Sequence, residues 1–204
     1  MTKLLSIFPE HLEDTKLEQA AECLKQGGIV IYPTDSIYAM GCSITQPRSI
    51  ERMVKIKGIR PDKAVFSLIV NDFSHLTNYT RLTNNGVFKL LKRCLPGPFT
   101  FILEANSNSI RSMNSRRKTI GIRIPANPVT LALAEKLGCP IVSTSLHDED
   151  KITKFPTDPD EIFAHYNNAV DIVINGGYGK NEESTIIDCT GSEPVIIRQG
   201  LGVI

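Results

Sequence analysis

The chain has 204 residues, of which 41% are hydrophobic, and its formal net charge is +1 at pH 7. This length suits one large domain, and the apolar content excludes an intrinsically disordered chain. No apolar run is long enough to cross a bilayer, and the first residues lack the pattern of a secretory signal peptide. We therefore expect a globular, cytoplasmic protein. The five cysteines lie far apart in apolar surroundings, which indicates reduced thiols.

Five helices are predicted along the chain. A capping-box pattern at Thr15 and Glu18 indicates the start of the first helix, and the Gly27-Gly28 pair would end it. The others are indicated by an N-terminal proline, a capping residue or apolar periodicity. They begin at Pro47, near residue 83, at Asn127-Pro128 with a stop at Gly138, and at Asp158-Pro159.

Eight apolar, β-branched runs have the length of strands. Several are apolar on both faces, as strands covered by helices are, and the last two follow each other with no helix between them. We therefore predict a single α/β (α+β) domain with an open, twisted, mixed sheet flanked by helices. The predicted strands are residues 28–32, 65–70, 99–103, 119–124, 140–143, 170–174, 184–189 and 194–198.

Polar side chains gather at the ends of these strands, where open α/β sheets bind their ligands. The stretch GGIVIYPTDSIYAMGC runs from an apolar strand into Pro33 and several hydrogen-bonding groups, among which Asp35 is expected to pin the turn. Each group alone has an ordinary structural explanation, whereas together the hydroxyls and guanidinium groups suit an anionic ligand. These residues are Thr34, Asp35, Ser36, Tyr38, Thr100, Arg123, Ser143, Thr144, Ser145, Ser184, Thr185 and Arg198.

Positive charge is concentrated in two parts of the chain. Nine basic residues and one acid, Glu104, lie between Arg81 and Arg123. The stretch KIKGIRPDK adds four more cations, which are Lys55, Lys57, Arg60 and Lys63. Such zones are either solvated faces or binding surfaces for phosphates. The chain contains no P-loop, no GxGxxG, no His and Cys cluster with metal-ligand spacing and no Ser-His-Asp order, and we expect no protein metal site.

Seven segments, taken in order, resemble the YrdC/YciO family, the threonylcarbamoyl-adenylate synthases of tRNA modification. They are GGIVIYPTDSIYAMGC, IKGIRPDK, LPGPFTFIL, KTIGIRIPANP, PIVSTS, STIID and IIRQG, and they span residues 27 to 200. The resemblance implies a YrdC-like fold in which an open twisted sheet encloses a basic concave pocket. It also implies one YrdC-like domain over residues 1–204, with its motifs in a core of about residues 12–200, as in the single-domain members.

The family's reaction converts L-threonine, bicarbonate and ATP into threonylcarbamoyl-AMP and pyrophosphate, for the t6A37 modification of tRNA. The resemblance implies that ATP is a substrate and that Mg²⁺ binds through its phosphates. It assigns catalytic roles to Lys57 and Arg60, which would hold the triphosphate. The implied ATP site comprises Lys55, Lys57, Arg60, Thr100, Ser143, Ser145, Ser184 and Arg198. The implied threonine site comprises Thr34, Tyr38 and Arg123.

Two segments depart from the synthase pattern. A Lys-x-Arg pair normally precedes the proline, whereas residues 57–61 here read KGIRP; either Lys55 and Lys57 act as the pair, or Arg60 keeps its place and the lysine shifts. The usual Ser-x-Asn is replaced at residues 145–147 by SLH. Both departures are typical of the YciO-type branch.

The sequence is compatible with three hypotheses. The chain is an active synthase, a nucleotide-binding relative with weak or different activity, or a module that grips double-stranded RNA by its phosphates. A synthase would release pyrophosphate only with threonine and bicarbonate, whereas RNA binding would weaken steeply with salt and ignore threonine. The expected partners are ATP, L-threonine and bicarbonate, with tRNA, double-stranded RNA and proteins of the t6A pathway as further partners, and no membrane.

Overall fold

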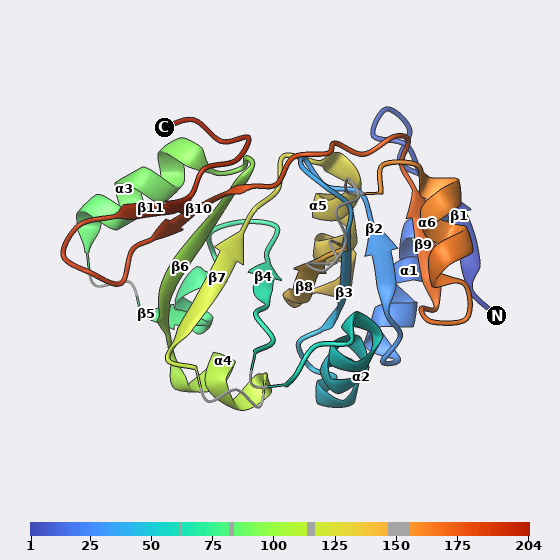
Figure 1. Ribbon diagram of the computed structural model, residues 1–204, viewed down its shortest axis with the longest axis horizontal. Coiled ribbons are helices and arrows are strands. Elements are labelled where there is room, and N and C mark those ends of the chain that lie inside the picture. The colour runs from blue at the N-terminus through green and yellow to red at the C-terminus, as the bar shows by residue number, and fades with distance from the viewer. Residues whose placement is uncertain (62, 82–83, 114–116, 147–155) are drawn as a thin grey trace.

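The computed structural model of the protein describes residues 1–61, 63–81, 84–113, 117–146 and 156–204. Within them, eleven strands form one continuous sheet (Figure 1). The strands are β1 (Lys3–Ser6), β2 (Val30–Tyr32), β3 (Ala39–Ser43), β4 (Ser67–Ile69), β5 (Thr80–Arg81), β6 (Phe99–Ala105), β7 (Thr119–Arg123), β8 (Ile141–Ser145), β9 (Ile172–Asn175), β10 (Thr185–Asp188) and β11 (Val195–Arg198).

Helices connect many of these strands. They are α1 (Asp14–Lys25), α2 (Pro47–Lys57), the short 3₁₀ turn η1 (Leu76–Asn78), α3 (Asn85–Cys94), α4 (Ser107–Ser112), α5 (Pro128–Leu137) and α6 (Pro159–Tyr166). No helix among the described residues is long and apolar enough to span a membrane.

The sheet is mixed and open, as the sequence predicts. Ten strands follow the order β1-β9-β2-β3-β8-β4-β7-β6-β10-β11, and β5 pairs with β6 beside this path. β9 pairs in parallel with β1 and β2, β4 with β7, and β6 with β10, while the other pairs are antiparallel. The N-terminus lies beside β1 at one end of the molecule, and the C-terminus lies near α3 at the other (Figure 1).

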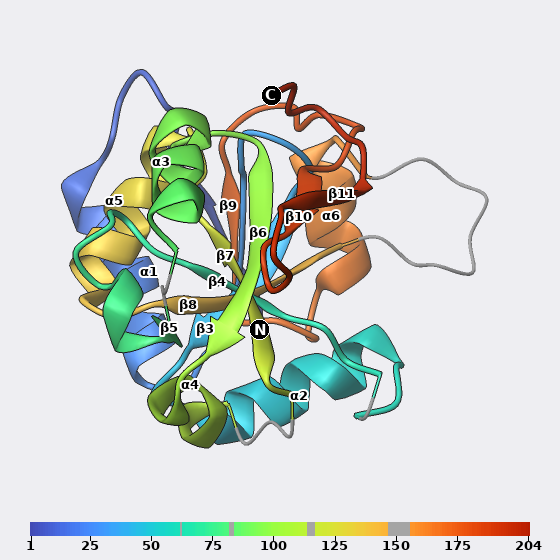
Figure 2. The ribbon, with the colours of Figure 1, turned by 90° about the vertical axis from the view of Figure 1, so that its left-hand side faces the viewer.

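Two apolar layers cover the faces of the sheet, as expected for strands that are apolar on both sides. Helices α1 and α5 pack against each other and against one face, and α6 lies on the opposite side (Figure 2). The first layer includes Leu17, Leu24, Val129 and Leu133 from these two helices. The second layer includes Ile50 and Met53 of α2, Val87 and Leu91 of α3, and Ile162 of α6.

Local signals place most helix ends correctly. Pro47 begins α2, and Gly58 ends it in the left-handed conformation at φ 66°. The side chains of Asn84, Asn127 and Asp158 each accept a backbone N–H at the start of α3, α5 and α6. The third helix is predicted to begin near residue 83, which lies outside the described residues, and the observed one starts at Asn85.

The predicted capping box at the first helix is wrong. Helix α1 already begins at Asp14, its N-cap is Glu13, and that side chain makes no cap hydrogen bond. Thr15 therefore lies inside the first turn with its side chain exposed. The helix thus begins two residues before the predicted start, and Leu17, Ala20, Ala21 and Leu24 form its buried face.

Sequence patterns miss three strands and the short helix α4. Strand β3 reads AMGCS, which has no β-branched residue, yet it is fully buried between β2 and β8. Strand β1 is a short apolar patch that becomes a strand by pairing with β9, 169 positions further along the chain at Lys3 and Ile172. Strand β5 has only two residues. Tertiary pairing, which local propensity does not report, determines these strands.

Candidate functional site

The side-chain hydroxyl of Thr34 stabilises the turn after β2. The Thr34 Oγ1 accepts a hydrogen bond from the Ser36 backbone N–H at 3.0 Å and donates to the Ile37 carbonyl at 2.7 Å. Pro33 cannot donate to a sheet ladder, which explains why β2 ends just before it. The hydroxyl that the resemblance assigns to threonine binding therefore also shapes the turn that carries it.

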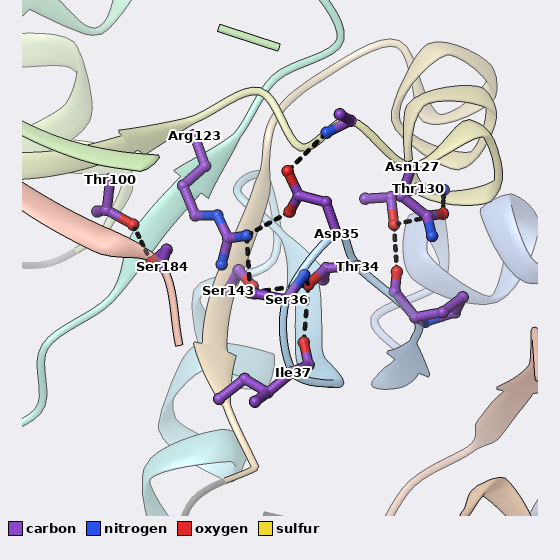
Figure 3. Close-up of polar contacts among 12 residues, drawn as sticks. Thr34, Asp35, Ser36, Ile37, Thr100, Arg123, Asn127, Thr130, Ser143 and Ser184 are labelled. Atoms are coloured by element: carbon purple, nitrogen blue, oxygen red, sulfur yellow. Dashed lines mark hydrogen bonds and ion pairs between the residues drawn. The ribbon is translucent and has the colours of Figure 1, made fainter. Parts of the chain in front are cut away.

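Arg123 reaches this turn from β7. Its Nη2 donates to the Asp35 Oδ1 at 2.7 Å and to the Ser36 Oγ at 3.1 Å, as Figure 3 shows. The other Asp35 oxygen accepts the Ala126 backbone N–H at 2.8 Å. Asp35 thus joins two distant segments, where the sequence suggested only that it pins its own turn. This partnership could not be found in the sequence because 88 positions separate Asp35 from Arg123.

One nitrogen of the Arg123 side chain has no hydrogen-bond partner among the described residues. The side chains of Arg123 and Asp35 are only 10% and 7% exposed. The Nε of Arg123 is buried and has no hydrogen-bond partner, the only such side-chain atom found within the described residues. A buried donor without a partner is costly, so this nitrogen marks a place where a ligand atom would be favourable.

A second group of predicted residues meets where β6, β10 and β11 come together. The hydroxyls of Thr100 and Ser184 are 2.9 Å apart. Arg198 donates from Nη2 to the Ser184 carbonyl at 2.9 Å, from Nε to the same oxygen at 3.2 Å, and from Nη1 to Glu183. Three of the residues assigned to the ATP site are therefore in direct contact.

The third group lies at β8. The Tyr32 hydroxyl donates to the Ser143 Oγ at 2.6 Å, and burial raises the pKa of Tyr32 above its usual range. The Nζ of Lys57 donates to the Ser145 carbonyl at 2.8 Å and to the Thr144 Oγ1 at 3.2 Å. Lys57 thus sits at the end of β8, between helix α2 and the sheet.

A row of small side chains connects these groups across the sheet. Gly41 pairs with Ser143, Ser143 with Ser67, and Ser67 with Gly121, so all four share one face. A Cβ placed at Gly121 would lie 3.2 Å from both the Ser67 Cβ and the Thr100 Cγ2. Neighbouring side chains therefore already pack closely against the backbone at Gly121. Arg123 follows two positions after Gly121 and extends from the same face.

The Tyr38 hydroxyl already hydrogen-bonds to the protein backbone. Its hydroxyl donates to the Gly177 carbonyl at 2.7 Å and accepts the Gly176 backbone N–H at 3.1 Å. Burial raises its pKa to about 12, so the phenol stays protonated. The role of Tyr38 in threonine binding stays a prediction, and its present bonds anchor the segment after β9.

The remaining predicted cations are more peripheral. Lys55 and Arg60 are exposed, and Gly58 ends α2 between Lys57 and Arg60, so those two cations belong to different elements. His147, which replaces the usual asparagine, lies outside the described residues.

Two surface hollows lie away from these groups. One of about 50 Å³ is lined by residues that include His75, Glu135 and Cys139. The other, of about 480 Å³, lies between α3 and the turn before β11 and includes Lys89, Arg93 and Glu193. Neither is lined by a predicted site residue, and the basic concave pocket stays a prediction.

Comparison with known proteins gives a consistent result over the whole chain. A family model for Sua5, YciO and YrdC proteins, described as telomere recombination, matches residues 22–200. An uncharacterized protein of Haemophilus influenzae is 40% identical over 99% of this chain and 97% of its own length. The crystal structure of YciO from Escherichia coli is 38% identical with a TM-score of 0.91, covering 100% of this chain and 98% of its own.

A more distant match carries a named activity. The threonylcarbamoyl-AMP synthase of Pyrococcus abyssi is 27% identical over 98% of this chain and 58% of its own length. The crystal structure of Sua5 from the same organism, complexed with L-threonine, matches with a TM-score of 0.89 at 27% identity over 98% of this chain and 58% of its own. This chain therefore corresponds to somewhat more than half of that protein.

Proposed function

The chain belongs to the family of Sua5, YciO and YrdC proteins, and on that premise we propose that it forms threonylcarbamoyl-AMP and pyrophosphate from L-threonine, bicarbonate and ATP. The observation that carries this proposal is the Nε of Arg123, a buried cationic donor without a partner beside Ser36 and the row of small residues. A carboxylate is the complement of a guanidinium group. The bound threonine of the Pyrococcus abyssi structure is a ligand with that group.

The two ends of the site suit the two parts of the product. Arg123, with Thr34 and Tyr38 nearby in the turn after β2, would hold the amino acid by its carboxylate and hydroxyl. Thr100, Ser184 and Arg198 would hold the nucleotide, with Ser143 and Ser145 between the two ends. Lys57, Lys55 and Arg60 would neutralise the triphosphate.

The reaction makes few covalent demands on the protein. The threonine amine attacks the carbon of bicarbonate and water leaves, which forms a carbamate. A carbamate oxygen then attacks the α-phosphorus of ATP, and pyrophosphate leaves with the electron pair of the broken P–O bond. Positioning of the reactants and cations near the developing phosphate charge would supply most of the rate.

Magnesium would be held through ATP. Within the described part of the chain, no group of three or more His, Cys, Asp and Glu side chains is placed to hold a metal ion. The hydroxyls, lysines and arginines of the site suit phosphate rather than Mg²⁺. The ion would therefore take its ligands from phosphate oxygens and water, as is common for Mg²⁺ in nucleotide sites.

The test is pyrophosphate release by the full chain with Mg²⁺ and ATP. Release is expected to require both L-threonine and bicarbonate, and to fall at least about a hundredfold in Lys57→Ala or Arg60→Ala, in line with the loss of a group that stabilises transition-state charge. Lys89→Ala, an exposed cation on α3, is the matched control and should keep the parent rate. An Arg60→Ala variant as fast as the parent would remove Arg60 from the mechanism.

A second candidate is a nucleotide-binding relative with little of this turnover. The end of α2 at Gly58 favours it, because Lys57 and Arg60 then approach from different elements and Lys57 is already bonded to β8. Its signature is ATP binding without threonine-dependent release of pyrophosphate. Binding of double-stranded RNA or tRNA would instead show a steep salt dependence and no effect of threonine.

A further inference from the structure

The connection from β9 to β10, residues 176–184, crosses most of the sheet. β9 is the second strand from one end of the sheet order and β10 is the second from the other. Figure 1 shows this segment running along the top of the molecule from α6 toward β10. It contacts the turn after β2, where the Lys180 backbone N–H donates to the Ser36 carbonyl at 3.3 Å. The segment therefore borders both ends of the candidate site.

Near its end the connection places a carboxylate on a site arginine. Glu183 accepts a hydrogen bond from the Nη1 of Arg198 while the Nε and Nη2 of Arg198 donate to the carbonyl of Ser184. The guanidinium group, which could bind a phosphate, is thus engaged by the chain itself. The Ser184 hydroxyl adjoins both Arg198 and Thr100, so the carboxylate is bonded to an arginine that belongs to this group of donors.

The backbone of Glu183 is packed closely, whereas its side chain is partly exposed. A Cβ placed at Gly200 would lie 2.3 Å from the Glu183 carbonyl oxygen, which shows how closely the two backbones are packed. The carboxylate is 24% exposed, and Arg198 is its only partner found among the described residues. By contrast, the carboxylate of Asp35 is 7% exposed and holds two partners. Asp35 is therefore the more deeply buried and the more fully bonded of the two carboxylates.

We propose that Glu183 is a specificity-determining residue that competes with anionic ligands for Arg198. An incoming phosphate must displace the carboxylate or bind beside it, and like charges at hydrogen-bond distance repel. The affinity for nucleotides is therefore lower than the affinity that Arg198, Ser184 and Thr100 would give without the Glu183 carboxylate. A ligand whose phosphate displaces the Glu183 carboxylate and binds Arg198 directly is therefore favoured over a ligand that leaves the pair of Glu183 and Arg198 intact.

This inference rests on the proposed nucleotide site, and one titration separates the two. Binding of Mg²⁺-ATP to the full chain would be measured calorimetrically for the parent, Glu183→Gln, Glu182→Gln and Arg198→Ala. Glu183→Gln removes the charge and should tighten binding about tenfold, or about 1.4 kcal/mol. Glu182→Gln, an exposed neighbour with the same change in charge, should alter affinity less than twofold. Arg198→Ala should weaken binding.

Glu183→Asp is the second variant, because it keeps the charge but shortens the reach to Arg198, and it should tighten binding less than Glu183→Gln. Equal gains in Glu183→Gln and Glu182→Gln would overturn the competition by showing a general charge effect. No gain in either Glu183 variant, with binding still lost in Arg198→Ala, would overturn it and leave the nucleotide site standing. Absence of ATP binding in all variants would overturn the nucleotide site and this inference together.

Discussion

Arg123 and Asp35 form an ion pair between β7 and the turn after β2, with 2.7 Å between Nη2 and Oδ1. Three strands, β3, β8 and β4, lie between β2 and β7 in the sheet. The pair therefore spans the middle of the sheet on the face that carries the row of small residues. The pair holds Arg123, the buried arginine of the candidate site, in place. The same Asp35 carboxylate also accepts a hydrogen bond from the Ala126 backbone N–H.

Replacing Asp35 with asparagine is expected to destabilise the fold strongly. The change leaves the Arg123 charge buried without compensation, and breaking a buried pair in this way costs about 3–5 kcal/mol. The measurement is the free energy of unfolding in urea. Asp14→Asn is the control, because Asp14 is 75% exposed in its ion pair with Lys136, and it should cost less than about 1 kcal/mol. Equal costs at the two positions would show that the Arg123 pair contributes little.

Gly41→Ala is expected to destabilise the centre of the sheet. A Cβ at this position would lie 2.4 Å from the Ile141 Cγ2 and 2.9 Å from both the Tyr32 Oη and the Val142 carbonyl. Overpacking of this kind costs about 1–3 kcal/mol. Gly191→Ala, whose nearest neighbour would be 3.8 Å away, is the matched control and should stay within about 0.5 kcal/mol. Thermal unfolding of both variants would distinguish the two sites, and a neutral Gly41→Ala would contradict the packing.

Asn127→Ala should weaken the start of α5. The Asn127 Oδ1 accepts the Thr130 backbone N–H at 3.1 Å, and loss of such a cap costs about 1 kcal/mol. Thr15→Ala is an informative comparison, because the sequence pattern assigns a cap to Thr15 and the structure places it inside α1. Its stability should change by less than about 0.5 kcal/mol in urea unfolding. A larger loss of stability in Thr15→Ala than in Asn127→Ala would contradict this assignment and show that Thr15 caps α1.

Alkaline pH should lower stability through the buried thiol of Cys42. Burial raises the pKa of Cys42 from 9.0 to about 12. Between those values the unfolded chain loses this proton and the folded chain keeps it, so the free energy of unfolding falls as pH rises. Burial also raises the pKa of Cys23 and Cys189 to about 11, which acts in the same direction.

The measurement is urea unfolding of the parent and of Cys42→Ala at pH 7, 9 and 10.5, in reducing buffer because all five cysteines are free. The loss of stability with pH should be shallower in the variant by roughly 1.4 kcal/mol per pH unit above about pH 9. Parallel pH profiles for the two proteins would show that Cys42 titrates normally in the folded state.

Several features of this protein were already determined by short stretches of its sequence. Asn127-Pro128, Asp158-Pro159 and Pro47 predict helix starts because capping and proline geometry act within one turn. Apolar β-branched runs locate eight strands because side-chain burial repeats along each strand. The ordered segments from GGIVIYPTDSIYAMGC to IIRQG identify the family, which the match over residues 22–200 confirms.

Tertiary structure alone decided which polar groups meet and which are already engaged. No local pattern connects Asp35 with Arg123 or Tyr32 with Ser143, because those contacts depend on the order of strands across the sheet. The same holds for β3, whose small residues form a strand only between β2 and β8. A sequence shows which groups are available for binding, whereas long-range pairing sets their partners. That pairing brings the Glu183 carboxylate into contact with Arg198, the group expected to bind phosphate.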